Sequence, residues 1–522
     1  MQFTSYSFLL FTAIVILGYY LVPRKIQWVW LLAASYVFYL WAGIEFVVFI
    51  LFTTCSTYGA TQIIGKRLEQ QEAYLAEHKK DLTRDERKEY KNRIKSGNRI
   101  WMIACLAANF GILALCKACL VEPLRTAFSG GGLSFLTLGL PMGISFYMFQ
   151  SMGYVVDVYR GTAKAEKNFF RLALFVSFFP QLVQGPISKF SQLAPTLYAP
   201  KAFDGKRVSF GLQRILWGYF KKLVVADRIA AAVVALKGPE YTGVSFLVLT
   251  VFYAVQIYGD FTGGIDIAVG IGETLGIQLP ENFIRPYFSK NIAEYWRRWH
   301  ISLGVWMKDY IFYPLSVCQP MLKHSKAARQ KLGNFGKRLP VYVASIATWF
   351  VTGIWHGLSP NFVVWGMLNC FVIVVSEELA PLYEKFHNRF GLKEKTWYGG
   401  FEMLRMFFLM NLIRACDLFP KVGEYFRRMG SLVTTFNFHV LWDGTMMKLG
   451  LTGLDYIILA CSIALMFAVS LLQEKKGSVR EMLQRRSAPV RYALIFALLL
   501  VVLLMGSYGI GYNAGNFIYN QF

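Results

Sequence analysis

Long apolar runs are the feature that most constrains how this chain can fold. Crossing the roughly 30 Å hydrocarbon core of a bilayer takes about 20 residues. Two apolar segments, at 168–187 and 208–236, are interrupted by Pro, Gly or paired Lys, which indicates re-entrant or tilted helices and not simple spans. With 55% hydrophobic and only 16% charged residues, the sequence predicts an all-α polytopic membrane protein with about 11–13 membrane helices around a central tunnel. The runs of sufficient length lie near 7–22, 27–42, 45–62, 100–120, 139–157, 244–271, 341–358, 361–380, 401–415, 452–473 and 491–513.

Basic residues indicate how these runs are oriented. The net charge is +24, but Lys and Arg crowd into short segments between apolar runs, a pattern that indicates topology and not nucleic-acid binding. The positive-inside rule places the segments at 64–99 and 474–491 in the cytoplasm and both termini outside. Mixed Lys, Arg and Glu residues at 64–99 also predict a solvated helical hairpin. We expect one membrane-embedded domain over 1–522, with core motifs at 100–420 and C-terminal spans at 451–514.

Several classes of site have little support in the sequence. The eight cysteines are scattered, and Cys116 and Cys119 have the spacing of a metal-binding pair without a second pair or a nearby histidine. No Walker lysine motif, Rossmann glycine pattern, nucleophile elbow or HExxH motif is present. We therefore predict no metal site and no tightly bound cofactor, and the sequence gives little support to a nucleotide motor, a dehydrogenase, a soluble-type hydrolase or a zinc protease.

Two histidines stand inside tryptophan-rich apolar sequence, where an imidazole loses its hydration and needs a functional reason. The first, His300, follows Trp296-Arg-Arg-Trp299. If this stretch is helical through Lys308, Trp296, His300 and Gly304 share one face at i, i+4 and i+8. Trp and Arg residues around one histidine either hold an anionic or thioester-linked ligand or anchor an interfacial helix. The residues alone leave both hypotheses open.

The second histidine, His356, lies between Trp355 and Gly357, with Gly353 one turn earlier. Glycines on both sides let another backbone or a ligand approach the imidazole. Burial lowers the pKa of a histidine, so the neutral form that accepts a proton dominates near pH 7. The pattern is typical of a general base and also of a core histidine bonded to a carbonyl.

Other polar residues interrupt the apolar sequence. Asp260 and Asp266 lie where hydrophobicity predicts a span, so they must be paired, hydrogen-bonded or protonated, and Arg297 and Arg298 are the nearest candidate partners in the His300 motif. Glutamines beside prolines at 178–187 indicate either a tunnel wall or the packing of kinked helices. The residues predicted to position a substrate or donor are Trp296, Arg297, Arg298, Trp299, Ser302, Trp355, Asp260, Gln181 and Gln184.

In combination these motifs resemble the membrane-bound O-acyltransferase family. The resemblance covers residues 100–420 and looks closest to the bacterial branch that acetylates alginate or D-alanylates teichoic acid. Residues 309–315 and the aromatic C-terminus at 516–522 are similar to the acetylating type, whereas 316–320 and Gly264 depart from it. The matching segments, in order, are Leu140–Gln150, Asp157–Gly161, Phe179–Pro186, Asp260–Gly263, Pro280–Phe283, Trp296–Leu303, Lys308–Tyr310 and Gly353–Gly357.

The resemblance implies a function and roles for both histidines. His356 maps to the catalytic histidine of the family, and His300 maps to a second histidine in the catalytic tunnel. The implied reaction passes an acyl group, most simply acetyl, from a cytoplasmic thioester such as acetyl-CoA or an acyl carrier to an extracytoplasmic envelope polysaccharide. An SGNH-type partner outside the membrane would complete the transfer, and the protein would lie in the bacterial plasma membrane.

Two alternatives stay open at the level of sequence. D-alanyl transfer to teichoic acid uses the same motifs with a different acyl group. A carrier or lipid flippase would instead use Asp260, Asp266 and the histidines as an ion relay within a polar cavity. Acyl transfer by the purified protein separates these classes, because a carrier cannot perform it.

Overall fold

The computed structural model describes residues 1–120, 124–128, 139–509 and 512. Helices dominate these residues, and their only β-type pairing is an isolated antiparallel bridge between Phe283 and Trp299. The prediction of an all-α protein is therefore confirmed. The aromatic segment at 516–522, which contributed to the family resemblance, lies outside the described residues.

Six helices of the described chain are long and apolar enough to cross a membrane, which confirms a multi-pass membrane protein. Other apolar runs form shorter helices, such as α1 (Tyr6–Leu21) and α2 (Gln27–Leu40). The total of about 11–13 membrane helices therefore remains a prediction. The six candidates are Ile44–Glu77, which contains α3 (Val47–Glu77), α4 (Arg84–Ala118), α12 (Val244–Leu275), α18 (Pro360–Glu378), α22 (Gly453–Lys476) and α24 (Ala488–Met505).

The chain packs as two compact units. Unit 1 comprises residues 1–211 and 268–280, and unit 2 comprises 212–267 and 281–522. The expectation of one domain over 1–522 stays a prediction. The remaining helices up to residue 219 are α5 (Leu124–Phe128), α6 (Ile144–Arg160), α7 (Phe169–Ser177), α8 (Phe179–Leu182), α9 (Phe190–Leu197) and α10 (Gly205–Tyr219).

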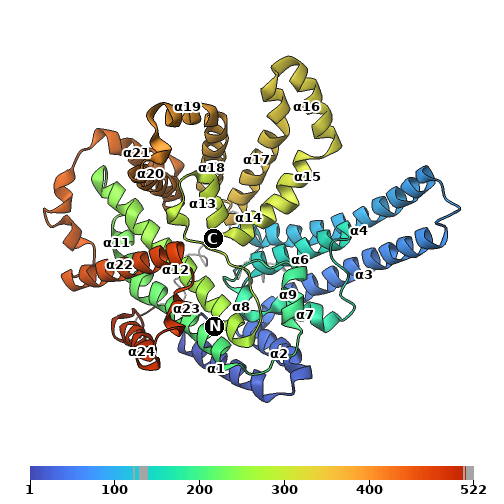
Figure 1. Cartoon of the computed structure of the whole chain (residues 1–522), viewed down its shortest axis with the longest axis horizontal. Coiled ribbons are helices and arrows are strands. Elements are labelled where there is room, and N and C mark those ends of the chain that lie inside the picture. The colour runs from blue at the N-terminus through green and yellow to red at the C-terminus, as the bar shows by residue number, and fades with distance from the viewer. Residues whose placement is uncertain (121–123, 129–138, 510–511, 513–522) are drawn as a thin grey trace. The chain divides into compact units, whose positions relative to one another are not determined.

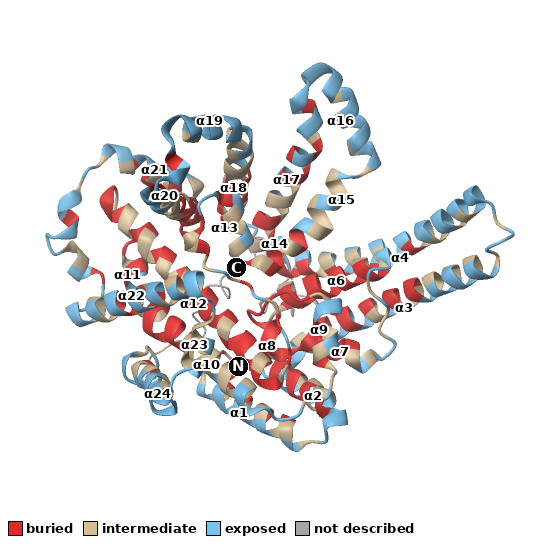
Figure 2. Cartoon of the chain, viewed as in Figure 1, coloured by how far each residue is buried: buried red, intermediate tan, exposed pale blue. Residues whose placement is uncertain are grey.

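Unit 1 contains the helical hairpin that the charge pattern predicted. Its two arms are the distal ends of α3 and α4, and both helices continue directly into apolar spans (Figure 1). A capping box between Thr83 and Glu86 begins α4, and the tips of both helices are exposed (Figure 2). Along α3, Thr53, Thr57 and Thr61 recur every fourth residue as a buried face of small side chains, which allows α3 to pack closely against its neighbours α4 and α6.

Unit 2 begins with an irregular helix that packs against α12. After α10, residues Phe220–Ala226 form a π-helix, η4, and the chain continues into α11 (Asp227–Ala235). A Cβ added at Gly218 would lie 2.6 Å from the carbonyl oxygen of Gly263, and one added at Gly263 would lie 2.8 Å from that of Gly218. Only glycines permit this approach, so the two backbones lie close together and short side-chain contacts form between them.

The rest of unit 2 is a series of helices around the predicted site. Two short helices, α13 (Ile292–Arg298) and α14 (Ile301–Met307), flank His300, and α17 (Asn334–His356) ends at the second histidine. Helices α17 and α18 pack against each other. The other helices are α15 (Tyr313–Ser316), α16 (Gln319–Leu332), α19 (Ala380–Phe390), α20 (Thr396–Arg414), α21 (Val422–Thr434) and α23 (Val479–Gln484).

Candidate active site

His300 occupies a strained turn between two helices. Its backbone has φ 47° and ψ 52°, a left-handed conformation that residues other than glycine rarely adopt. The prediction of one continuous helix from Trp296 to Lys308 is therefore wrong, because α13 ends at Arg298 and α14 begins at Ile301. Such strain persists only where surrounding contacts hold it, and it is frequent at functional sites.

Asn282 supplies those contacts. Its Oδ1 accepts hydrogen bonds from the backbone N–H of Ser302 at 3.0 Å and from the Ser302 hydroxyl at 2.9 Å, and it lies 3.2 Å from His300 Nδ1. Its backbone carbonyl accepts a further bond from the N–H of Ile301 at 3.0 Å. Because Oδ1 is an acceptor, Nδ1 of His300 carries the proton, and the lone pair of the neutral ring lies on Nε2. Asn282 lies in the Pro280–Phe283 motif, but it was not among the predicted site residues.

The buried setting keeps His300 neutral. Its side chain is almost wholly enclosed, with 3% of the residue exposed. Burial, reinforced by the nearby Arg414 guanidinium, lowers the pKa of His300 to about 3. The imidazole is therefore uncharged across the physiological range, in a form that can accept a proton.

Aromatic rings bring the two histidines into one cluster. The Trp355 ring centroid lies 5.9 Å from that of His300 and 4.8 Å from that of His356. Trp365 packs edge-on against His356 at 4.8 Å and also contacts Trp296 at 5.9 Å. We call these five residues the histidine cluster. The structure thus joins His300, Trp296, Trp355 and His356, which the sequence had predicted as site residues.

Close packing of two helices positions His356. This histidine is the last residue of α17, and Gly357 follows it in an extended conformation. A Cβ added at Gly353 would lie 2.6 Å from the backbone oxygen of Phe362, and one at Gly366 would lie 2.4 Å from that of Trp349. These glycines therefore allow α17 and α18 to meet backbone to backbone.

A buried arginine that the sequence analysis missed lies behind Trp299. The Arg414 guanidinium sits 4.3 Å from the Trp299 ring centroid, and Trp299 stacks on Tyr295 with centroids 5.7 Å apart. Burial raises the pKa of the nearby Asp417 to about 7, against the opposing effect of Arg414. Arg414 is a buried cation near His300, and the face of the Trp299 ring is its main contact.

The region also holds hydrogen-bond donors that no other described group satisfies. These buried donors are Nε1 of Trp296, Nδ2 of Asn282 and Nε of Arg414. Unsatisfied buried donors are uncommon and require an explanation. A ligand oxygen is one such explanation at a site of this kind.

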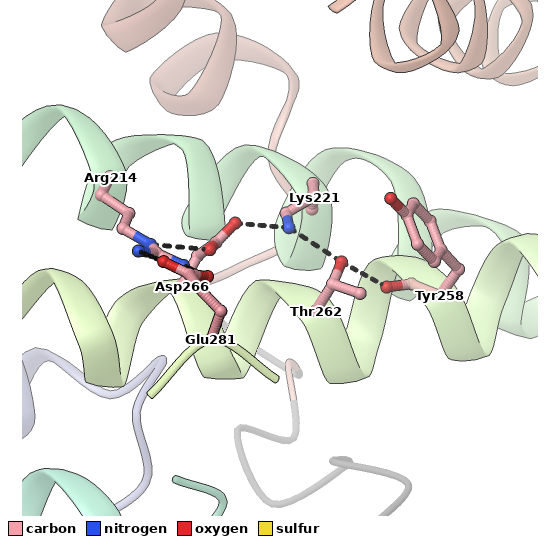
Figure 3. A network of polar contacts seen from close by, with 6 residues as sticks. All are labelled: Arg214, Lys221, Tyr258, Thr262, Asp266 and Glu281. Atoms are coloured by element: carbon pink, nitrogen blue, oxygen red, sulfur yellow. Dashed lines mark hydrogen bonds and ion pairs between the residues drawn. The ribbon is translucent and has the colours of Figure 1, made fainter. Parts of the chain in front are cut away.

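The two membrane aspartates have different partners from those expected. Lys222 Nζ lies 2.5 Å from Asp260 and 2.8 Å from Asp227. Lys221 Nζ lies 2.5 Å from Asp266 and donates to the Thr262 hydroxyl at 2.8 Å (Figure 3). We call the contacts of Lys222 the first carboxylate cluster and those of Lys221 the second carboxylate cluster.

The second carboxylate cluster extends to a further ion pair. Arg214 Nε donates to Asp266 at 2.9 Å, and the same guanidinium makes two 2.6 Å bonds to Glu281 (Figure 3). The predicted pairing with Arg297 and Arg298 is wrong, because Arg298 contacts Glu294 and Glu474, whereas Arg297 is exposed. Helices α10 and η4, brought close by the glycines at 218 and 263, supply the actual partners.

The two predicted glutamines, Gln181 and Gln184, belong to unit 1. Gln181 Nε2 donates to the Pro186 carbonyl at 2.6 Å and to the Ser188 hydroxyl at 2.5 Å. Gln184 is fully buried, and its side-chain amide has no hydrogen-bond partner among the described residues. Their role toward a substrate, like that of Arg297, Arg298 and Asp260, stays a prediction.

Comparisons with known proteins identify the family of this chain. The membrane-bound O-acyltransferase family model matches residues 165–417. The probable alginate O-acetylase AlgI of Pseudomonas putida is 32% identical over 389 residues, covering 73% of this chain and 71% of that protein. The chain belongs to the membrane-bound O-acyltransferase family.

Other relatives are named for different polymers of the cell envelope. The peptidoglycan O-acetyltransferase of Helicobacter pylori is 32% identical over 321 residues, which are 55% of this chain and 57% of that protein. The teichoic acid D-alanyltransferase of Bacillus subtilis is 27% identical over 264 residues, covering 49% and 63%. The chain spans 64% to 71% of the length of five alginate O-acetylases that it matches.

Proposed function

We propose that this protein is an O-acyltransferase that passes an acetyl group from a cytoplasmic thioester toward an extracytoplasmic polysaccharide of the bacterial envelope. The observation that carries the proposal is the histidine cluster, in which His300 and His356 both pack on Trp355. Family membership supports the reaction class, and the relatives named for alginate and peptidoglycan acetylation support the acetyl group.

The cluster supplies the parts that acyl transfer needs. His356 removes the proton from an acceptor hydroxyl, whose oxygen then attacks the thioester carbonyl. The tetrahedral intermediate collapses with loss of the thiolate, which takes the proton from His356, so that the products are an ester and a free thiol. The unsatisfied N–H groups of Trp296 and Arg414 supply donors that stabilise the oxyanion.

Asp260 and Asp266 favour acetyl over D-alanyl as the acyl group. A D-alanyl group carries an ammonium that needs a carboxylate nearby in a low-dielectric site. Both aspartates are already paired, Asp260 with Lys222 and Asp266 with Lys221 and Arg214. The same pairing argues against an ion relay of the kind that a carrier would use. By family likeness, an SGNH-type partner receives the acetyl group outside the membrane.

Replacing His356 tests the proposal. In cells that depend on this protein for acetylation, His356→Ala should reduce base-labile acetate on envelope polymers by at least about 100-fold, because a general base contributes that much or more. Ester-linked D-alanine on those polymers should not change.

His439 provides the control, because its side chain is 64% exposed and it is not a member of the histidine cluster. His439→Ala should acetylate like the wild type, and both variants should purify with the same elution profile and thermal stability. Near-wild-type acetylation in His356→Ala would remove this residue from the mechanism. Loss of D-alanine with acetate retained would reverse the choice of acyl group.

A further inference from the structure

Unit 2 contains an open cavity of about 780 Å³ that is distinct from the histidine cluster. Its wall is formed by residues of α10, η4, α12, α22, α23 and α24, together with 281–285. The side chain of Phe283 separates the two places, since it lines the cavity and packs 5.0 Å from the Trp299 ring and 6.5 Å from the His300 ring. The volume falls within the range of about 300–1,000 Å³ typical of ligand sites.

One side of the cavity is polar and rigid. It carries the second carboxylate cluster, in which Arg214 and Lys221 are bonded to Asp266 and Glu281 (Figure 3). Two further arginines, Arg285 and Arg480, also line the cavity. Ion pairs among the cluster fix its side chains, so this polar side keeps its shape whether or not the cavity is occupied.

Much of the remaining wall is apolar and belongs to two membrane helices. Within their most apolar windows, only 17% of α22 and 6% of α24 is buried by the rest of the chain, so most of their remaining surface faces lipid. Figure 2 shows the exposed surface of α24. An apolar tail can therefore reach this wall from the bilayer. Representative lining residues are Leu465, Met466, Leu494, Leu498 and Val501.

The charge around the cavity is positive. Its lining holds four cationic residues against two carboxylates, and Glu474, which pairs with Arg285, lies just outside. The segment that joins α22 to α24, residues 474–491, contains six basic and two acidic residues. Basic pockets between membrane helices near a positive loop are typical sites for anionic lipid headgroups.

We propose that this cavity binds an anionic phospholipid. Its phosphate lies at the end lined by Arg285 and Arg480, and an acyl chain lies along α22 and α24. The apolar wall holds the acyl chain, and the positive lining selects an anionic over a zwitterionic headgroup. The proposal does not depend on acyl transfer, because it concerns a second cavity and a bound lipid.

Lipid retention by the full-length protein tests the proposal. The protein would be reconstituted in bilayer discs of equal phosphatidylglycerol and phosphatidylcholine, repurified in detergent, and its retained lipid quantified by mass spectrometry. We expect the wild type to retain phosphatidylglycerol at about one per chain and in at least about tenfold preference, the effect of one charge-assisted contact. Glycerol 3-phosphate at millimolar concentration should not displace it.

Two variants and two matched controls locate the site. Arg480→Gln should lower the preference for phosphatidylglycerol about tenfold, and Leu498→Trp should narrow the cavity and lower retention of both lipids. Arg486→Gln, in the same connecting segment, and Leu504→Trp, at a residue of α24 that is 78% exposed, should behave like the wild type. Neither control residue lines the cavity.

Specific outcomes would overturn the proposal. Equal retention of the two lipids by the wild type would show that the charge does not select a headgroup. Displacement by glycerol 3-phosphate would show a site for free anions, without a role for the acyl chain. Equal losses in Leu498→Trp and Leu504→Trp would show annular lipid at the surface of α24. None of these results depends on acetylation by the protein.

Discussion

The carboxylate clusters and the histidine cluster both bury polar groups in unit 2, but they satisfy them differently. In the carboxylate clusters, each buried charge meets an opposite charge within 2.9 Å. In the histidine cluster, the polar groups lie among indole rings, and its member Trp296 and the neighbouring Asn282 retain N–H groups without partners among the described residues. Complete pairing indicates a structural role, whereas spare donors in an aromatic enclosure indicate a site that a substrate completes.

Breaking a carboxylate cluster should have the largest effect, and it should appear in stability. Lys222→Met leaves Asp260 and Asp227 buried without their cation, which should cost about 3–5 kcal/mol of unfolding free energy. Thermal unfolding and the fraction recovered as monodisperse protein in detergent measure this loss. Lys326→Met, at an exposed position of α16, is the control and should be neutral. A stable Lys222→Met protein would show that these ion pairs do not hold α12 against η4.

Breaking the histidine cluster should affect turnover and leave the fold intact. His300→Gln keeps a hydrogen-bonding group of similar size but loses the imidazole geometry, so we expect a decrease in kcat of about 100-fold or more. The KM for the thioester should change little, because the substitution acts at the reacting centre. Wild-type kinetics in this variant would assign His300 a packing role, as for the carboxylate clusters.

Asn282 sharpens the comparison because it positions His300 without reacting itself. Asn282→Ala removes the acceptor for Nδ1 of His300 and for Ser302, and kcat should fall about 10-fold to 100-fold. Asn282→Asp keeps an acceptor oxygen, so it should recover part of kcat. Its carboxylate also favours the imidazolium, so the acid limb of the pH profile should move to higher pH. A purely structural asparagine would give no such shift between the two variants.

The smallest effect concerns pH and again distinguishes the two regions. The pKa of His300 is about 3 in the folded protein and about 6.5 when unfolded, so the unfolded state binds the proton first as pH falls. Stability from this neutral imidazole is therefore complete above pH 6.5 and declines below it, by about 2 kcal/mol at pH 5. Unfolding of the wild type and His300→Gln should be compared at pH 7 and pH 5. Identical pH dependence in both proteins would show that His300 does not cause the loss of stability at low pH.

Local patterns predicted much of the fold and part of the site. Apolar runs indicated the membrane helices, and tryptophan-rich context identified His300 and His356 before any distance was known. The left-handed turn at His300 could not be predicted, because Asn282, 18 residues earlier, holds it. The partners of Asp260 and Asp266 come from 38 and 45 residues earlier, and Arg414 lies 119 residues beyond Tyr295. Sequence proximity therefore suggested the wrong arginines, since tertiary packing decides which charges meet.

The π-helix η4 has a consequence for changes of chain length. A π-helix closes its hydrogen bonds one residue later than an α-helix, so η4 acts as a one-residue insertion that the helix absorbs. Because of this widened turn, the consecutive residues Lys221 and Lys222 reach two different carboxylates of α12. Deleting Phe220, the residue before both lysines, would restore the α-helical register and rotate both ammonium groups away from their aspartates. A single codon lost here would therefore damage the protein more than most single substitutions in the same segment.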